Sequence, residues 1–183
     1  MSTPTDPTTQ PTTDATQPTD GTGAATTTGP ATSTDTAGPL AEAEITALQQ
    51  ALAAESAAVW GYELLAPWLA EDARPAAIAL SRSHLQRREA TAERLDAGGA
   101  TPDLAAPAYQ PATPVTDPAT AGLFAQDLEI DCAGGWRAVI GSTDDTELRG
   151  FALAGLSDAA VRLAQRKLAA GVTPATVPFP GQA

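Results

Sequence analysis

The stretch ITALQQALAAESAAVWGYELLA, residues 45–66, decides the fold. Within it, seven residues follow one another at alternating steps of three and four positions: Ile45, Leu48, Leu52, Glu55, Val59, Tyr62 and Ala66. All of them are apolar or aromatic except Glu55, and together they form one stripe. This spacing places the stripe on one face of an α-helix, so Glu55 is expected to point into whatever the apolar face packs against. Because an isolated buried carboxylate is costly, Glu55 must meet a cation, a metal ion or hydrogen-bond donors.

Working outward from this stretch, the sequence predicts an all-α domain over residues 41–183. Four helices are expected, at about 41–70, 75–97, 117–140 and 144–170. Pro75 suits a first helical turn, and Gly98 suits a helix end. Asp117 is a good N-cap for the third helix, and Asp144 starts a capping-box-like pattern for the fourth.

The connections predict how these helices are arranged. The first and second helices, and the third and fourth, are joined by short links and should form antiparallel hairpins. The proline-rich link over residues 100–116 is long enough to cross the full length of a bundle, so the second and third helices can lie parallel. One long crossover between four helices is the ferritin-like topology. Gly134 and Gly135 weaken the third helix and indicate a close helix crossing or a local irregularity.

Residues 1–40 differ in composition from the rest of the chain. They are rich in Thr and Pro and contain no aromatic residue, Lys or Arg, so we expect a disordered tail. Their start has neither the basic residues nor the apolar core of a signal peptide. A glycosylated stalk of an exported protein is the alternative interpretation of this tail.

Charge and composition exclude several classes of partner. The net charge of −12 argues against nucleic acid and anionic membranes. No apolar run approaches the roughly 20 residues that a membrane-spanning helix needs. Cys132 is the single cysteine, which excludes an internal disulfide and a zinc site built from cysteines. The sequence therefore predicts an acidic cytoplasmic protein.

Ionisable residues lie near the middle of every predicted helix, at a similar height in a bundle. Among Asp127, Glu129 and Asp131 only some can face inward, and Glu129 is favoured. The predicted polar core consists of Glu55, His84, Arg87, Arg88, Glu129, Asp158 and Arg162.

A di-iron centre of the ferritin type does not suit this set. Such a centre takes a Glu from two helices and a Glu-x-x-His pair from each of the other two. No such pair occurs in the sequence. The residue three positions before His84, the single histidine, is Ser81 rather than a glutamate. Arginines at the same height occupy the place of a metal. No cofactor is therefore predicted; the alternative is a divergent oxidase or iron-handling protein that holds iron or manganese through Glu55, His84, Glu129 and Asp158.

The preferred interpretation is a buried salt-bridge layer. Asp158 and Arg162 are four residues apart and can pair on one helix face, while Glu55 can take Arg88 or His84 from the neighbouring helix. This predicts a non-enzymatic binding or interaction module, with a homodimer through the tryptophan-bearing faces as a possible assembly. A small-molecule pocket lined by the same residues stays open, with its ligand unknown. Core-filling roles are expected for Trp60, Tyr62, Trp68, Cys132 and Trp136.

Five stretches of the chain resemble a ferritin-like domain of unknown function common in actinobacteria. They are LQQALAAESAAVWGYELL (48–65), SHLQRREATAERLDAGGATP (83–102), PAYQPATPVTDPATA (107–121), GLSDAAVRLAQRKLAAG (155–171) and ATVPFPG (175–181). The resemblance implies a four-helix ferritin-like bundle without an assigned biochemical role. It aligns the family's helix glutamate with Glu55, its His-x-x-Arg-Arg motif with residues 84–88 and its Asp-Ala-Ala-Val-Arg motif with residues 158–162. Where the family usually has His after that glutamate, this chain has Ser56, which removes a potential metal ligand.

Overall fold

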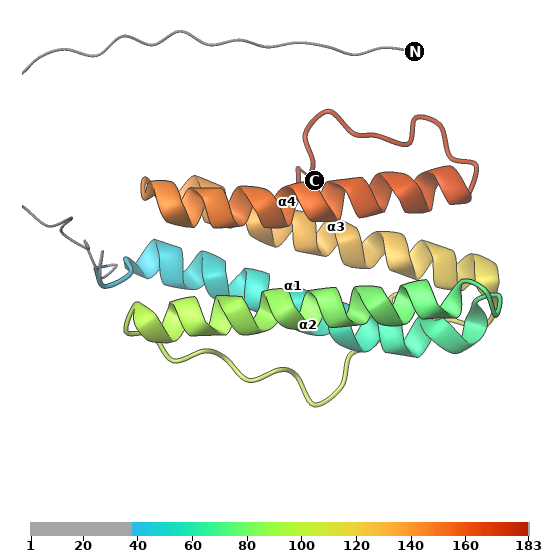
Figure 1. Cartoon of the computed structure of the whole chain (residues 1–183), viewed down its shortest axis with the longest axis horizontal. Helices are drawn as coiled ribbons and strands as arrows, with labels where there is room; N and C mark the ends of the chain where they lie inside the picture. The colour runs from blue at the N-terminus through green and yellow to red at the C-terminus, as the bar shows by residue number, and fades with distance from the viewer. Residues whose placement is uncertain (1–37, 183) are drawn as a thin grey trace, which may run out of the picture. The chain divides into compact units, whose positions relative to one another are not determined.

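The computed structural model describes residues 38–182, which form a bundle of four long helices (Figure 1). The helices are α1 (Glu42–Leu65), α2 (Arg74–Ala97), α3 (Pro118–Ser142) and α4 (Thr146–Ala169), with a short 3-10 turn, η1 (Ala66–Trp68), after α1. Within residues 38–182 there is no β-strand, so the predicted all-α class is confirmed. The predicted disordered tail lies, except for its last three residues, outside the described part of the chain.

Local chemistry explains where these helices begin and end. α1 ends at Leu65, earlier than the expected position near residue 70, because Pro67 lacks the N–H that a continuing helix needs. α3 begins after Asp117, whose carboxylate accepts a hydrogen bond of 2.8 Å from the N–H of Thr120. The N-cap of α4 is Asp145 rather than the expected Asp144, since the Asp145 carboxylate accepts from the N–H of Leu148.

The helices are connected as the loop lengths predicted. α1 packs against both α2 and α3, and α4 packs against α3. α2 and α3 run in the same direction. Residues 98–117, which connect the end of α2 to the start of α3, run back along the length of the bundle (Figure 1). The side chain of Gln49 holds this crossover at two points: it donates to the carbonyl of Thr101 at 2.8 Å and accepts from the N–H of Asp103 at 3.0 Å.

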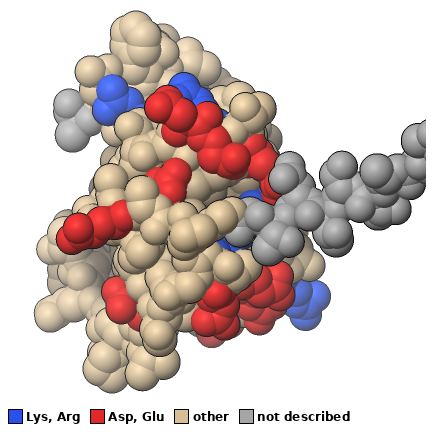
Figure 2. Space-filling model, turned by 90° about the vertical axis from the view of Figure 1, so that its left-hand side faces the viewer, with Lys and Arg blue, Asp and Glu red and all other residues tan. Residues whose placement is uncertain are grey.

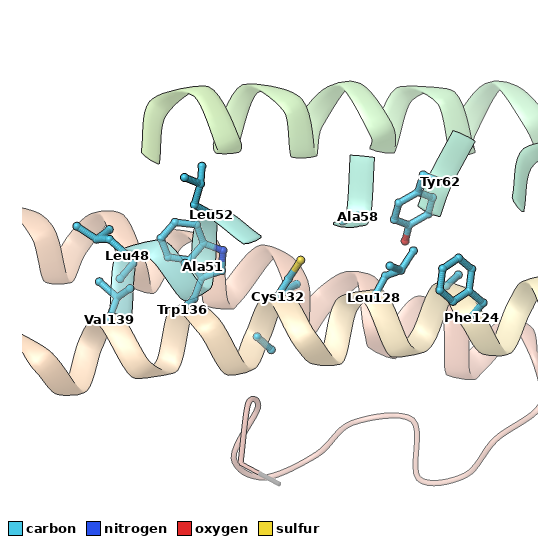
Figure 3. Packing of buried hydrophobic residues seen from close by; sticks show 14 of the residues in the cluster. Leu48, Ala51, Leu52, Ala58, Tyr62, Phe124, Leu128, Cys132, Trp136 and Val139 are labelled. Carbon is cyan, nitrogen blue, oxygen red and sulfur yellow. The ribbon is translucent and has the colours of Figure 1, made fainter. Parts of the chain in front are cut away.

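Many of the buried hydrophobic side chains lie on α1 and α3. Figure 3 shows Leu48 and Val139 at one end of the interface between these helices, Tyr62 and Phe124 at the other, and Cys132 and Trp136 between them. Gly135 allows the close crossing that the sequence indicated, because a Cβ atom there would lie 2.9 Å from the Cα of Ala51. The crossing brings the middle of α3, with its polar residues, directly against the middle of α1.

Acidic side chains gather at the end of the bundle where α1 and α4 begin (Figure 2). Glu42 and Glu44 lie in the first turn of α1, and Glu147 lies in the first turn of α4. Negative side chains interact favourably with the positive end of the helix dipole, so this placement stabilises both helices. Within residues 38–182, no helix combines the length and the apolar character required to cross a membrane.

Candidate functional site

Glu55 lies in the interior of the bundle, as its place in the apolar stripe of α1 predicts. It is only 3% exposed, and both of its carboxylate oxygens have partners. Oε1 accepts a hydrogen bond of 2.7 Å from Nε1 of Trp136 on α3, and Oε2 lies 2.7 Å from Nδ1 of His84 on α2. Glu55 therefore joins three helices through one side chain.

Glu129 supplies a second buried carboxylate on the other side of the histidine. Its Oε1 accepts a hydrogen bond of 2.6 Å from the hydroxyl of Tyr62 and lies 3.4 Å from Nε2 of His84. Its Oε2 is buried and has no hydrogen-bond partner among the described residues. The Tyr62 ring stacks on the imidazole, with centroids 5.3 Å apart. We call Glu55, His84, Glu129, Tyr62 and Trp136 the buried centre.

His84 sits between two carboxylates, and this arrangement sets its protonation state. Burial by itself lowers the pKa of His84, but hydrogen bonds and charge attraction from Glu129 and Glu55 outweigh it and raise the pKa above its usual value. Arg162 opposes them, with its guanidinium 3.4 Å from Nε2. With a carboxylate oxygen near each ring nitrogen, this environment favours the imidazolium form of His84, which can donate to both carboxylates.

A pH titration should report this state directly. Because His84 is the single histidine, its imidazole C–H signals in an NMR spectrum are unambiguous, and we expect them to titrate above about pH 6.5, the value for a free histidine. A histidine with a raised pKa stabilises the fold fully below that value and loses this contribution as the pH rises through the higher folded pKa. The urea midpoint should therefore fall over this range in the wild type and not in His84→Gln. Titration below pH 6.5 would contradict the imidazolium.

Of the seven residues predicted for the polar core, the structure brings together four. Glu55, His84 and Glu129 are buried in contact, and Arg162, half-buried on α4, lies at their edge. Arg88 does not reach Glu55: it lies at the surface of α2, 3.9 Å from its sequence neighbour Glu89.

Arg87 and Asp158 also lie outside the buried centre. They form a separate ion pair with an N–O distance of 2.7 Å across the α2–α4 seam, and the Asp158 side chain is 51% exposed. The expected pairing of Asp158 with Arg162 is wrong, because α2 brings the Arg87 guanidinium to that carboxylate instead. The Arg87 guanidinium also lies over the rings of Trp136 and Phe151. Asp158 therefore cannot serve as a ligand beside His84.

Tyr62 and Trp136 fill the core, as expected, and they also hold the carboxylates. Tyr62 and Trp136 each donate a hydrogen bond to one glutamate, and burial, followed by the charge of Glu129, raises the pKa of Tyr62, which keeps its hydroxyl protonated. The sequence spacing of Tyr62 and Trp136 relative to the two glutamates could have indicated this role. Tyr62 follows Glu55, and Trp136 follows Glu129, by seven residues, which is two helical turns on the same face.

Cys132 adds a sulfur atom to the buried centre. Its Sγ lies 4.0 Å from Nδ1 of His84, and one ligand atom each of Glu55, His84 and Cys132 lie within 4.8 Å of one another. Burial, with the nearby glutamates, raises the pKa of the Cys132 thiol well above its usual value and keeps it protonated. These residues do not fit a di-iron centre, because α4 presents Arg162 and Arg166 where such a centre needs carboxylate and histidine ligands.

Comparison with known proteins gives a family and a structural relative. The structure is similar to the crystal structure of a conserved hypothetical protein, rv2844, from Mycobacterium tuberculosis, with 29% sequence identity and a TM-score of 0.68. That match covers 71% of this chain and 98% of the other chain. No curated protein matches the sequence. Since residues 47–183 match its sequence pattern, the chain belongs to the family described as "Domain of unknown function (DUF4439)".

Proposed function

We propose that this domain is a non-catalytic binding module in which the buried centre fixes the register of the helices. The observation that carries the proposal is that both oxygens of Glu55 and both ring nitrogens of His84 already have partners within the chain. Catalysis needs groups that a substrate can reach, whereas Glu55, His84 and Glu129 are at most 3% exposed. Buried polar groups of this kind specify one arrangement of helices over others.

Kinship with ferritin-like proteins is part of the proposal. It is supported by the long crossover and by a glutamate at the middle of α1, where those proteins hold a metal ligand. In this chain an imidazolium and the α4 arginines supply the positive charge that a metal would bring. On this view the domain retains a metal-binding scaffold and has replaced its metal with side chains.

A metal-binding protein is the second candidate, and one observation favours it. The buried Oε2 of Glu129 lacks a partner among the described residues, and Glu55, His84 and Cys132 offer three further donor atoms nearby. Cys132 would then take the place of Asp158, which the sequence suggested as a ligand, and iron or manganese would be held by Cys132 together with the glutamates and His84. Metal ligands must be deprotonated, and the raised pKa values of His84 and Cys132 oppose this.

Elemental analysis of the full chain separates the two candidates. Protein purified without a metal-affinity step from cells supplied with iron, manganese and zinc should hold well below one equivalent of any of them. Its thermal midpoint should not change when EDTA is added. One equivalent of metal that is lost in Cys132→Ala, a change that removes a ligand and keeps a buried apolar side chain, would overturn the proposal in favour of a metal site.

A homodimer and a cytoplasmic location complete the proposal. Trp136 is fully buried and cannot form a contact between copies, whereas Trp68 is 40% exposed at the end of α1. A dimer would therefore use the face around Trp68. Sedimentation equilibrium of the wild type and of Trp68→Ala tests this, since a monomer in both cases contradicts a dimer. The cytoplasmic location stays a prediction of the sequence.

A further inference from the structure

A cavity lies between α1, α3 and the crossover. Its volume is about 500 Å³. Residues of all three segments line it: Ala57, Trp60, Tyr109, Gln110, Pro111, Ala112, Phe124, Asp127, Leu128, Ile130 and Asp131. Neither Lys nor Arg is among these residues. We call this cavity the aromatic pocket.

Three aromatic rings meet in the wall of the aromatic pocket. Trp60 on α1 lies in the middle, with its ring centroid 5.7 Å from that of Tyr109 on the crossover and 6.4 Å from that of Phe124 on α3. The rings pack against one another with their planes tilted at 46° and 80°, and all three residues line the cavity. The π faces of aromatic rings attract cations, and Trp attracts them most strongly.

The carboxylates of the pocket reinforce the same preference. Asp127 and Asp131 are four residues apart on α3 and therefore on one face of the helix. Neither forms an ion pair with a described residue; Lys167 lines the adjacent cavity together with Asp131 but does not pair with it. Burial raises the pKa of Asp127, and burial with the charge of Asp127 raises the pKa of Asp131. A positive ligand would relieve this repulsion between two carboxylates.

We propose that the aromatic pocket binds a small quaternary ammonium compound, with its cationic head against Trp60 and Tyr109 and beside Asp127 and Asp131. Apolar and aromatic walls suit the methyl groups of such a head, and the carboxylates balance its charge. A bare divalent cation fits less well, because its strong hydration calls for oxygen ligands around it, and three of the walls are rings. The proposal rests on the proposed function in one respect, since it names the ligand class of the binding module.

The test uses choline and its neutral carbon analogue, 3,3-dimethyl-1-butanol, with the full chain. Calorimetry should show choline binding at least about tenfold more tightly than the neutral analogue, because the two differ only in the charge that the rings and carboxylates attract. The chain has three tryptophans, which give three indole N–H signals in an NMR spectrum. Choline should shift the signal of Trp60 and leave that of the buried Trp136 unchanged.

Matched variants locate the binding site. Asp127→Asn with Asp131→Asn should weaken choline binding about fivefold or more, as expected for two partly exposed charges beside a cation. Glu93→Gln with Asp96→Asn removes the same charge from exposed positions on α2 and should leave the affinity unchanged. Tyr109→Leu removes a ring on the crossover, outside the helices, and should weaken choline binding while the helical content measured by circular dichroism is preserved.

Several results would overturn this proposal. They are equal affinity for the neutral analogue, displacement of choline by an equal concentration of Ca²⁺ or Mg²⁺, full affinity in the doubly neutralised variant, and no binding at millimolar choline. None of these depends on the buried centre. A metal ion found there, with choline binding intact, would remove the proposed structural role of that centre and leave the aromatic pocket as it is.

Discussion

Replacing Glu55 with alanine is expected to lower the free energy of unfolding by about 3–5 kcal/mol, because it leaves the buried imidazolium of His84 without its nearest counter-charge. The same change removes the acceptor for the Trp136 indole N–H. Urea unfolding followed by circular dichroism at pH 6, where His84 is protonated, measures the loss.

Graded variants separate charge from hydrogen bonding at this position. Glu55→Gln keeps an acceptor for Trp136 and removes only the charge, so its loss should be smaller than that of Glu55→Ala. Glu93→Gln, at an exposed position of α2, should change the stability by no more than about 0.5 kcal/mol. A loss below about 1 kcal/mol in Glu55→Ala would mean that water reaches the centre and that the ion pair is not desolvated.

Two neighbouring glycines of α3 should respond in opposite directions to the same substitution. Gly135→Ala is expected to destabilise the bundle by about 1–3 kcal/mol, because the added Cβ would lie 2.9 Å from the Cα of Ala51 and force the helices apart. Gly134→Ala meets nothing within 4 Å and should stabilise by up to about 1 kcal/mol through its better helix propensity. Thermal unfolding of the two variants measures the difference.

The glycine pair also tests whether α1 and α3 approach as closely as the structure describes. Both variants gain the same intrinsic helix propensity, so any difference in their thermal midpoints reports the contact with α1 alone. Equal stabilisation in both would show that the helices lie farther apart at the crossing. Their opposite response, in contrast, would locate the closest approach at Gly135, next to Trp136 and about one turn from Cys132.

Much of the fold could be predicted because it follows from local rules. The spacing of apolar residues around Glu55 sets the face of α1, and the length of residues 100–116 sets the direction of α3. The inward position of Glu129 followed from the same helical geometry. The end of α1 differs from the expected one because Pro67 stops the α-helix at Leu65, before the apolar residues that follow it.

The partners of the buried charges could be predicted only in part. Whether Arg87 or Arg88 points toward the other helices depends on the rotation of α2 about its own axis. The spacing of residues in the sequence does not determine this rotation closely enough to distinguish two neighbouring positions. Asp158 pairs with Arg87 of α2 rather than with Arg162 of its own helix. Sequence spacing predicts pairs within one helix but not the pairs that form between helices. Trp136 lies in the core, as its apolar ring predicts. Its indole N–H donates to Oε1 of Glu55, which leaves Oε2 to contact His84.

The crossover is attached to the bundle independently of the residues that line the aromatic pocket. Gln49 fastens it to α1 through main-chain atoms of residues 101 and 103, so the fastening is insensitive to which side chains the loop carries. Tyr109, a few residues farther on, is part of the same loop and contributes nothing to the buried centre. Substitutions at positions 109–112 are therefore expected to reshape the aromatic pocket without loosening this attachment.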